Sequence, residues 1–136
     1  MTIELTDKEF RRLLDMVYIG NWILNSARGT DRFLDYDLLQ EKLFSIAALR
    51  GMNALTQTYR GHIFPSRAYM EGGIHEAIAD YEDAVFFDIL AEELARRDME
   101  AEHLNPDDNN ELTPRIEEYL SEFEKNGVDN ISIDEG

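Results

Sequence analysis

Glu100 and His103 are the two residues whose types and spacing come nearest to a metal site. A glutamate and a histidine three apart on a helix present a carboxylate and an imidazole on one face, and carboxylate-bridged di-iron bundles use two such pairs with two further glutamates. This chain has one pair, since Glu71 and His75 are wrongly spaced across two glycines and His62 supplies no second pair. The more ordinary interpretation is a solvated helix end with a favourable cation near its C-terminus. We therefore predict no metal and no cofactor.

The other sequence patterns that could support catalysis are also absent or incomplete. The chain has no cysteine, which excludes disulfides, thiolate metal sites and cysteine nucleophiles. It contains neither a Gly-x-Ser-x-Gly nucleophile elbow nor a glycine-rich phosphate loop. Residues 107–118 place oxygen ligands at alternate positions like a calcium loop, but Leu112 stands where that loop needs glycine. The sequence favours a protein without catalysis; a metal-dependent enzyme that uses helix carboxylates is the alternative.

Charge is the clearest compositional signal. Among 136 residues, 29 are acidic and 13 are basic, which leaves a net charge of −16. Such a chain cannot neutralise a run of phosphates, so direct binding of nucleic acid is not expected. The excess is concentrated in residues 98–136, and an acidic surface steers basic proteins toward itself. We expect an interaction or regulatory protein with a basic protein partner; the alternative is that the acidity only keeps the chain soluble.

Two segments carry the candidate interaction residues. Residues 59–69 contain no acid, and arginine and aromatic side chains outside helices give much binding energy at interfaces. The last predicted helix supplies acids of the opposite charge, so we predict that the two segments are neighbours or two halves of one partner site. The candidates are Arg60, His62, Phe64, Arg67, Tyr69, Glu117, Glu118, Glu122 and Glu124. The alternative for the first segment is that its aromatic residues fill the core while its arginines pair with nearby acids.

Helices must position these residues, because the apolar spacing is helical over most of the chain. The expected fold class is all-α, with an irregular segment at 52–80 and a bundle of four main helices at about 7–28, 35–50, 83–102 and 114–126. Thr6 and Glu9 form a capping box before the first helix. Gly29 would end that helix in a left-handed turn, and Thr113-Pro114 would start the last helix.

The first predicted helix should be the centre of the bundle. Its segment Met16–Leu24 is apolar nearly all round, which is typical of a helix covered on several sides, so we expect it to be mostly buried. A short connection predicts an antiparallel pair with the second helix. The inward stripe of that second helix would be Leu39, Leu43, Ile46 and Ala47.

Residues 1–104 should form a helical core domain, and 105–136 an acidic C-terminal helix and tail that docks on it or stays loose. Alternation in Thr2–Leu5 and Val128–Ile133 is typical of short strands and would let the termini pair. The start of the sequence lacks the basic and apolar stretches of a signal peptide. The longest near-apolar stretch is far shorter than the ~20 residues that span a bilayer. A cytoplasmic protein without membrane contact is expected, and the oligomeric state is left open.

Three stretches, Val17–Trp22, Phe64–Arg67 and Phe87–Asp98, resemble a family of small, acidic, uncharacterised bacterial proteins of similar length. The similarity covers residues 3–100. The resemblance implies a bacterial and cytoplasmic context, and it implies no assigned activity and no catalytic residue.

Overall fold

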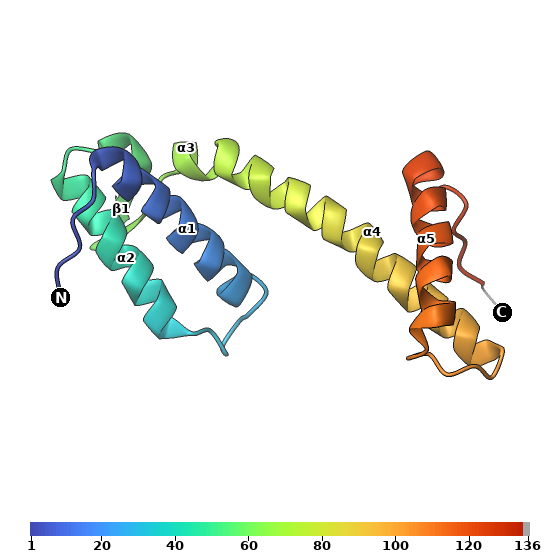
Figure 1. Ribbon diagram of the computed structural model, residues 1–136. Coiled ribbons are helices and arrows are strands. Elements are labelled where there is room, and N and C mark those ends of the chain that lie inside the picture. Colours follow the sequence, from blue (N-terminus) through green and yellow to red (C-terminus); the bar gives the residue numbers. More distant parts are fainter. Residues whose placement is uncertain (135–136) are drawn as a thin grey trace. The chain divides into compact units, whose positions relative to one another are not determined.

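The computed structural model describes residues 1–134 and is mainly helical (Figure 1). It divides into two compact units, Met1–Ile78 (the N-terminal unit) and Ala79–Gly136 (the C-terminal unit). The division lies inside helix α4, Gly73–Ala101, and not near residue 104. The reason is that α5, Asn109–Asn126, shares a core with the second half of α4.

Helices α1, Asp7–Asn25, and α2, Leu34–Leu49, form the antiparallel pair that the sequence predicts (Figure 1). The capping box is confirmed: the Glu9 N–H donates to the Thr6 hydroxyl at 3.1 Å, and the Thr6 N–H donates to the Glu9 carboxylate at 3.0 Å. The predicted end of α1 near residue 28 is wrong. Asn25 ends the helix because its side chain binds the loop that leads to α2.

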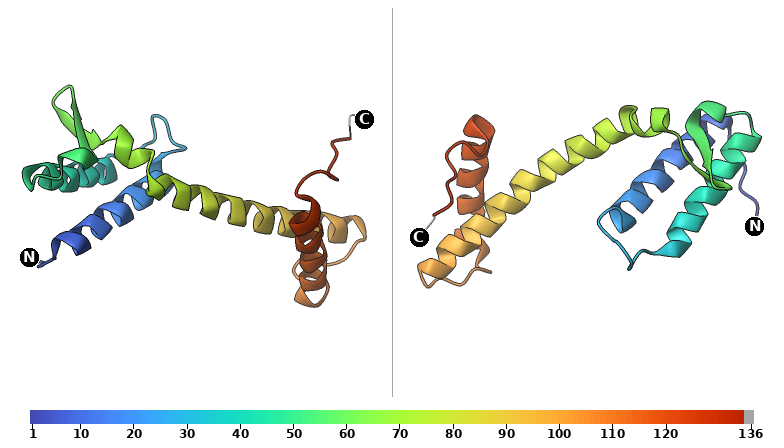
Figure 2. Two further views of the ribbon diagram at one scale, coloured as in Figure 1. Left: turned by 90° about the horizontal axis from the view of Figure 1, so that it is seen from above. Right: turned by 180° about the vertical axis from the view of Figure 1, so that it is seen from behind.

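Residues 52–80 are not irregular, which corrects the sequence prediction. Strands β1, Thr56–Tyr59, and β2, His62–Pro65, pair antiparallel with Tyr59 opposite His62. Arg60 and Gly61 between them have φ values of 50° and 80°, as a two-residue turn that matches strand twist requires. In both views of Figure 2 the hairpin lies beside α2. The fold is therefore mainly helical with a small sheet, and four-residue strands are too short to show a period in the sequence.

The chain returns to helix directly after the hairpin. A 3-10 turn, η1 (Asn53–Leu55), comes before the strands, and α3, Arg67–Met70, follows them. Ser66 caps α3, since its hydroxyl accepts from the Tyr69 N–H at 3.1 Å. Helix α4 begins at Gly73, well before the predicted start at 83, so its first turns belong to the N-terminal unit.

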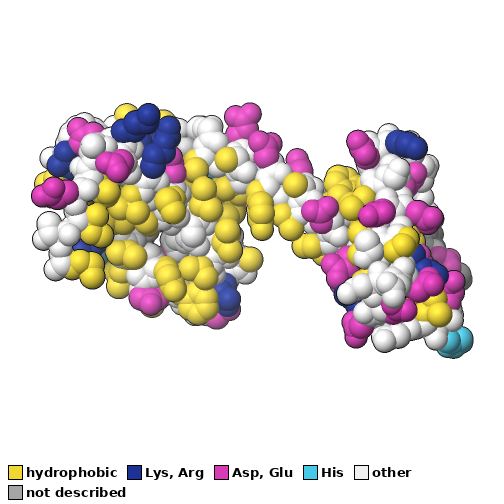
Figure 3. Space-filling model, viewed as in Figure 1, with side chains coloured by type: hydrophobic (Ala, Val, Ile, Leu, Met, Phe, Trp, Pro, Cys, Tyr) yellow, Lys and Arg dark blue, Asp and Glu magenta, His cyan; other side chains and the backbone are white. Residues whose placement is uncertain are grey.

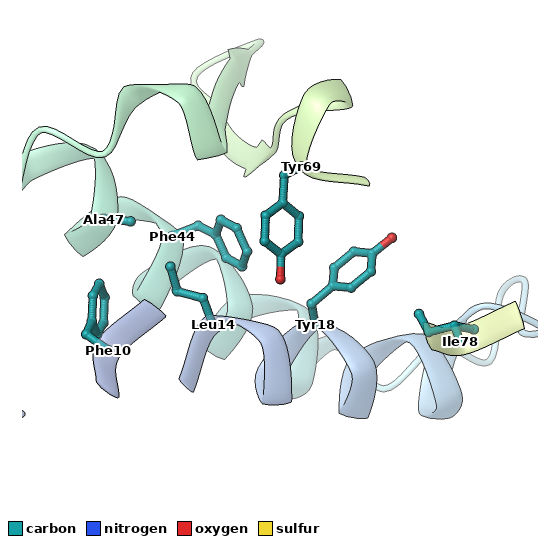
Figure 4. Close-up of a cluster of buried hydrophobic side chains, with 7 residues drawn as sticks. All are labelled: Phe10, Leu14, Tyr18, Phe44, Ala47, Tyr69 and Ile78. Atoms are coloured by element: carbon teal, nitrogen blue, oxygen red, sulfur yellow. The ribbon is translucent and has the colours of Figure 1, made fainter. Parts of the chain in front are cut away.

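The core of the N-terminal unit lies between α1, α2, α3 and the start of α4 (Figure 4). Phe44 and Tyr69 meet edge to face at 5.3 Å between ring centroids, and Tyr18 meets Tyr69 in the same way. Such edge-to-face pairs stabilise a core beyond the gain from burying apolar area. The whole cluster is Phe10, Leu14, Tyr18, Phe44, Ala47, Tyr69 and Ile78.

The prediction that Met16–Leu24 is mostly buried is wrong. Met16 and Ile23 are 70% and 66% exposed, and only Tyr18 and Asn21 in this segment are buried. Within the N-terminal unit the core covers α1 on one side, so the apolar residues on its other side stay at the surface. The inward stripe predicted for α2 is wrong for Leu39 and Ile46, which are 49% and 37% exposed, whereas Ala47 is buried and Leu43 packs against the core as predicted.

The C-terminal unit has its own small core. Ala91, Ala95 and Met99 of α4 are buried, and Leu112 of α5 packs with Ala95 and Met99. Phe123 of α5 lies beside Phe87 of α4, with 5.4 Å between the ring centroids. Figure 1 shows α5 crossing the last turns of α4. The alanines leave room for the α5 side chains to approach the helix, which is the kind of interdigitation that interiors require.

The predicted start of α5 at 114 is wrong by five residues. Asp108 caps the helix first, since its carboxylate accepts from the Asn110 N–H at 3.1 Å, and Pro114 therefore lies inside α5. Gly127, at φ 56°, ends the helix close to the predicted residue.

The predicted pairing of the termini is also wrong for the described residues. Residues 1–6 and 127–134 contain no strand. After α5 the backbone instead makes local turns, with the Ile131 N–H donating to the Val128 carbonyl at 3.0 Å. Near the N-terminus, Ile3 and Leu5 line a shallow apolar hollow on α1 with Leu13.

None of the helices within residues 1–134 has the length and apolar character needed to cross a membrane.

Candidate interaction surfaces

Three of the predicted interaction residues lie on the hairpin. Arg60 is in the turn, with its guanidinium 5.1 Å from the centre of the Tyr59 ring. The His62 Nδ1 lies 3.0 Å from the carboxylate of Glu41 on α2. Phe64 on β2 is 43% exposed. The hairpin thus presents a cation, an imidazole and an aromatic ring at the surface of the N-terminal unit.

Tyr69, by contrast, belongs to the core. It is buried, and its hydroxyl donates to Asp15 at 2.8 Å. Burial, with a further contribution from the Asp15 carboxylate, raises the pKa of Tyr69 far above its usual value. Arg11 lies 4.9 Å from the ring centre and pairs with Asp15. Arg67 is exposed and pairs with Glu71 at 2.7 Å, so it is available at the surface.

A groove of about 590 Å3 lies in the N-terminal unit, between α1, α2 and the hairpin. Trp22, Phe64 and Met70 give it apolar walls, and Asn21, Asp37 and Gln40 give it polar groups. The size and the mixed lining are those of small-molecule sites. The sequence signal was the pair Asn21 and Asn25, two amides four apart in an otherwise apolar helix.

The polar groups of the groove form a satisfied network. The Asn21 Nδ2 donates to Asp37 at 3.0 Å and to Gln40 at 3.2 Å. Arg32 donates two hydrogen bonds to Asp37, at 2.9 and 2.8 Å. The Arg32 hydrogen bonds are the main cause of a lowered pKa for Asp37, against the opposing effect of burial. Among residues 1–134, no buried side-chain nitrogen or oxygen lacks a partner. Because Asn21 lies on α1 and its two acceptors lie on α2, this network joins the two helices.

Asp37→Asn should make the N-terminal unit less stable at pH 7 and less sensitive to acid. The folded-state pKa of Asp37 is lowered, so its stabilising effect is complete above the unfolded-state value of about 3.9 and disappears as pH falls through the folded value. Urea unfolding followed by Trp22 fluorescence, at several pH values between about 7 and about 3, measures this. Glu4→Gln removes an exposed acid as the control; equal pH profiles for wild type and Asp37→Asn would contradict the prediction.

Glu100 and His103 do not share a helical face. Helix α4 ends at Ala101, and His103 has a left-handed backbone with φ of 59°. Glu100 and His103 therefore do not present a carboxylate and an imidazole on one helical face, as their spacing predicted. No group of three or more histidine, aspartate or glutamate side chains within residues 1–134 is arranged to hold a metal ion. The 107–118 segment is also not folded as a calcium loop, because α5 begins at Asn109 and most of the segment is helical.

The unit boundary divides charge far more sharply than the sequence alone suggested. The N-terminal unit has nine basic and ten acidic residues and a net charge of −1. The C-terminal unit has four basic and 19 acidic residues and a net charge of −15. In Figure 3 the visible face of the C-terminal unit carries acidic side chains, in magenta, whereas hydrophobic side chains gather over α1 and α2.

Within residues 79–134, four basic residues accompany 18 acidic ones, so most of these acids cannot be neutralised there. The arginines of this unit pair with five carboxylates, those of Glu92, Asp98, Glu102, Asp107 and Glu111. Asp98 also accepts from the Tyr119 hydroxyl. Burial acts to raise the pKa of Asp98, but the bonds from Tyr119 and Arg97 outweigh it and leave that pKa below its usual value.

The four predicted glutamates of α5 lie on its outer surface in two groups. Glu117 and Glu124 are exposed and seven residues apart, so they share one side of the helix. Glu118 and Glu122 line a hollow of about 610 Å3 with Asp98. Glu122 accepts from Asn130 and Asn126, and these bonds, Asn130 first, lower its pKa. No ion pair joins Glu117, Glu118 or Glu124 to another of the residues described.

A mixed stripe on α4, which we call the α4 stripe, was not predicted. It consists of Glu82, Phe86, Ile89 and Glu93, spaced i, i+4, i+7 and i+11 on one side of the helix. Phe86 and Ile89 are 51% and 57% exposed. Neither glutamate forms an ion pair within the described chain. The stripe therefore presents two apolar side chains between two carboxylates.

No family model matches the chain, and no curated protein or solved structure matches it significantly.

Proposed function

We propose that the chain is a non-catalytic interaction protein, acting in the cytoplasm, whose C-terminal unit binds a basic and amphipathic segment of a protein partner. One observation carries the proposal: a net charge of −15 in a unit that follows one of net charge −1. If acidity served solubility alone, both units would share it. Concentration of the acids in one unit creates a directional field that attracts cations.

The α4 stripe supplies short-range specificity for this partner. Glu82 and Glu93 are eleven residues apart on α4, about 16 Å along the axis, with Phe86 and Ile89 between them. A partner helix with a central apolar face and a Lys or Arg at each end fits this order of groups. The carboxylates give steering and orientation, and the apolar pair gives area that is removed from water.

A synthetic amphipathic helix of lysine and leucine residues tests the proposal when its binding is followed by fluorescence anisotropy. We expect binding to weaken at least about tenfold between about 50 and about 500 mM salt, because the attraction is screened. A peptide of the same composition in scrambled order, which forms no apolar face, should bind more weakly at either salt concentration.

Matched variants locate the site. Glu82→Gln with Glu93→Gln should weaken binding several-fold, and Phe86→Ser should weaken it without changing the salt dependence. Glu4→Gln with Glu76→Gln makes the same charge change in the N-terminal unit and should leave affinity unaltered. Equal losses from both glutamate pairs, or binding indifferent to salt, would refute the proposal.

A further inference from the structure

We propose that the chain forms a homodimer in which α2 packs antiparallel against α2 of a second copy. The proposal rests on the outer face of α2, defined here as Leu34, Leu38, Leu39, Ile46 and Leu49. Helical spacing puts these side chains along one side of the helix, opposite Phe44 and Ala47, which face the core.

The outer face is strongly exposed. Leu34, Leu38 and Leu49 are 67%, 64% and 88% exposed, and Leu39 and Ile46 are 49% and 37% exposed. Exposed apolar residues that occur singly need no explanation, but five on one side of a 16-residue helix form a continuous patch. Helix α2 is thus apolar on two sides, and the N-terminal unit covers one of them.

The area suits a small symmetric interface. These exposed fractions amount to roughly 500 Å2 of apolar surface, near the upper end of the largest patches on monomers, about 300–600 Å2. Two such faces with their polar rims approach the lower limit of specific interfaces, about 1,200 Å2 in total. Isologous contact between identical faces is the arrangement of C2 dimers, the commonest soluble homo-oligomers.

The charged residues at the two ends of α2 favour a second copy of this chain as the partner, and they favour antiparallel packing of the two helices. Asp35 lies in the first turn of α2, and Arg50 follows its last residue. Antiparallel packing places Asp35 opposite the partner's Arg50 and Leu39 opposite the partner's Ile46, and it opposes the helix dipoles favourably. Parallel packing would instead align each charged residue with its own copy. The N-terminal unit, at net −1, can pair with itself, whereas two C-terminal units would repel each other.

Lys42 is compatible with this arrangement. It lies near the middle of the outer face, about one residue along the helix from its own copy in this register, so the two apolar stems must cover leucine side chains while the like-charged ammonium groups turn away from each other into water. Arg50 already pairs with Asp7 in its own chain, and the guanidinium has enough donors for a second carboxylate.

The absence of cysteine allows a clean orientation test. Full-length Leu39→Cys and Ile46→Cys chains are mixed and oxidised. Antiparallel packing should give a disulfide between the two variants. It should give none within either variant alone, because copies of the same position would be about 10 Å apart along the helices, beyond disulfide reach. Disulfides between identical variants, or none in the mixture, would overturn the proposal.

Sedimentation equilibrium of the unmodified chain is the second measurement. We expect twice the 15.8 kDa chain mass at about 100 µM, and the chain mass for Leu38→Asp. Ile89→Asp makes the same change at an exposed position of α4 and should remain dimeric. Asp35→Arg should weaken the dimer, and Arg50→Asp in the same chain should restore it. Circular dichroism establishes that each variant is folded; an unmodified chain that is monomeric at this concentration would overturn the proposal.

Discussion

Phe44→Ala is expected to unfold the N-terminal unit under conditions in which the C-terminal unit stays folded. Phe44 is completely buried in α2, and its ring contacts Tyr69 edge to face. Truncation of a buried phenylalanine removes apolar contact and leaves a cavity, at a cost of about 3–5 kcal/mol. That cost is comparable to the whole stability of a small unit, about 5–15 kcal/mol for a domain.

Because the chain has a single tryptophan, unfolding of the N-terminal unit can be measured separately. Trp22 lies in the N-terminal unit, so its fluorescence reports on that unit, whereas circular dichroism reports on helices in both. In urea, Phe44→Ala should lower the fluorescence midpoint strongly and leave a later transition in circular dichroism. Phe86→Ala, at a half-exposed position of α4, is the control and should move neither midpoint much. Coincident loss of both signals in Phe44→Ala would show that the two units do not unfold independently.

Local signals in the sequence predicted local structure well. The capping box at Thr6 and the end of α5 near Gly127 depend on residues within one turn, and the structure confirms them. The hairpin was missed because its strands are four residues long and its turn contains arginine, a residue that rarely has positive φ. Pro114 suggested a helix start, but the earlier cap at Asp108 begins the helix.

Burial was predicted less well, for a physical reason. Apolar composition shows that a surface favours contact, but it does not show whether that contact lies in the same chain. Met16 and Ile23 on α1, and Leu39 and Ile46 on α2, were assigned to a core, yet the core of the N-terminal unit uses the opposite side of each helix. The same limit applies to the predicted sites: Tyr69 fills the core, while Arg60, His62, Phe64 and Arg67 lie at the surface.

Asn25→Asp is expected to destabilise the N-terminal unit by about 2–4 kcal/mol at neutral pH, because it inserts a charge and deletes donors in a buried position. Asn25 is 1% exposed. Its Nδ2 donates to Asn21 at 2.7 Å and to the Phe33 carbonyl at 3.1 Å, and its Oδ1 accepts from the Phe33 N–H at 2.8 Å. The new carboxylate can keep the last bond, but it would face two acceptors and the Asp37 carboxylate.

The pH dependence of this variant, relative to the unmodified chain, should have the same sign as that of Asp37→Asn, because one variant adds a carboxyl group with a raised pKa and the other removes a carboxyl group with a lowered pKa. Burial and the neighbouring acceptors would raise the pKa of the introduced carboxyl group above its unfolded value, about 3.9, so the folded state would bind the extra proton. The variant should therefore recover stability relative to the unmodified chain as pH falls from about 7 to about 4, because protonation restores a donor. Urea midpoints from Trp22 fluorescence measure this, and Asn53→Asp, at an exposed position before β1, is the control. A pH-independent loss would mean that the shape of the Asn25 side chain, and not its donors, joins α1 to α2.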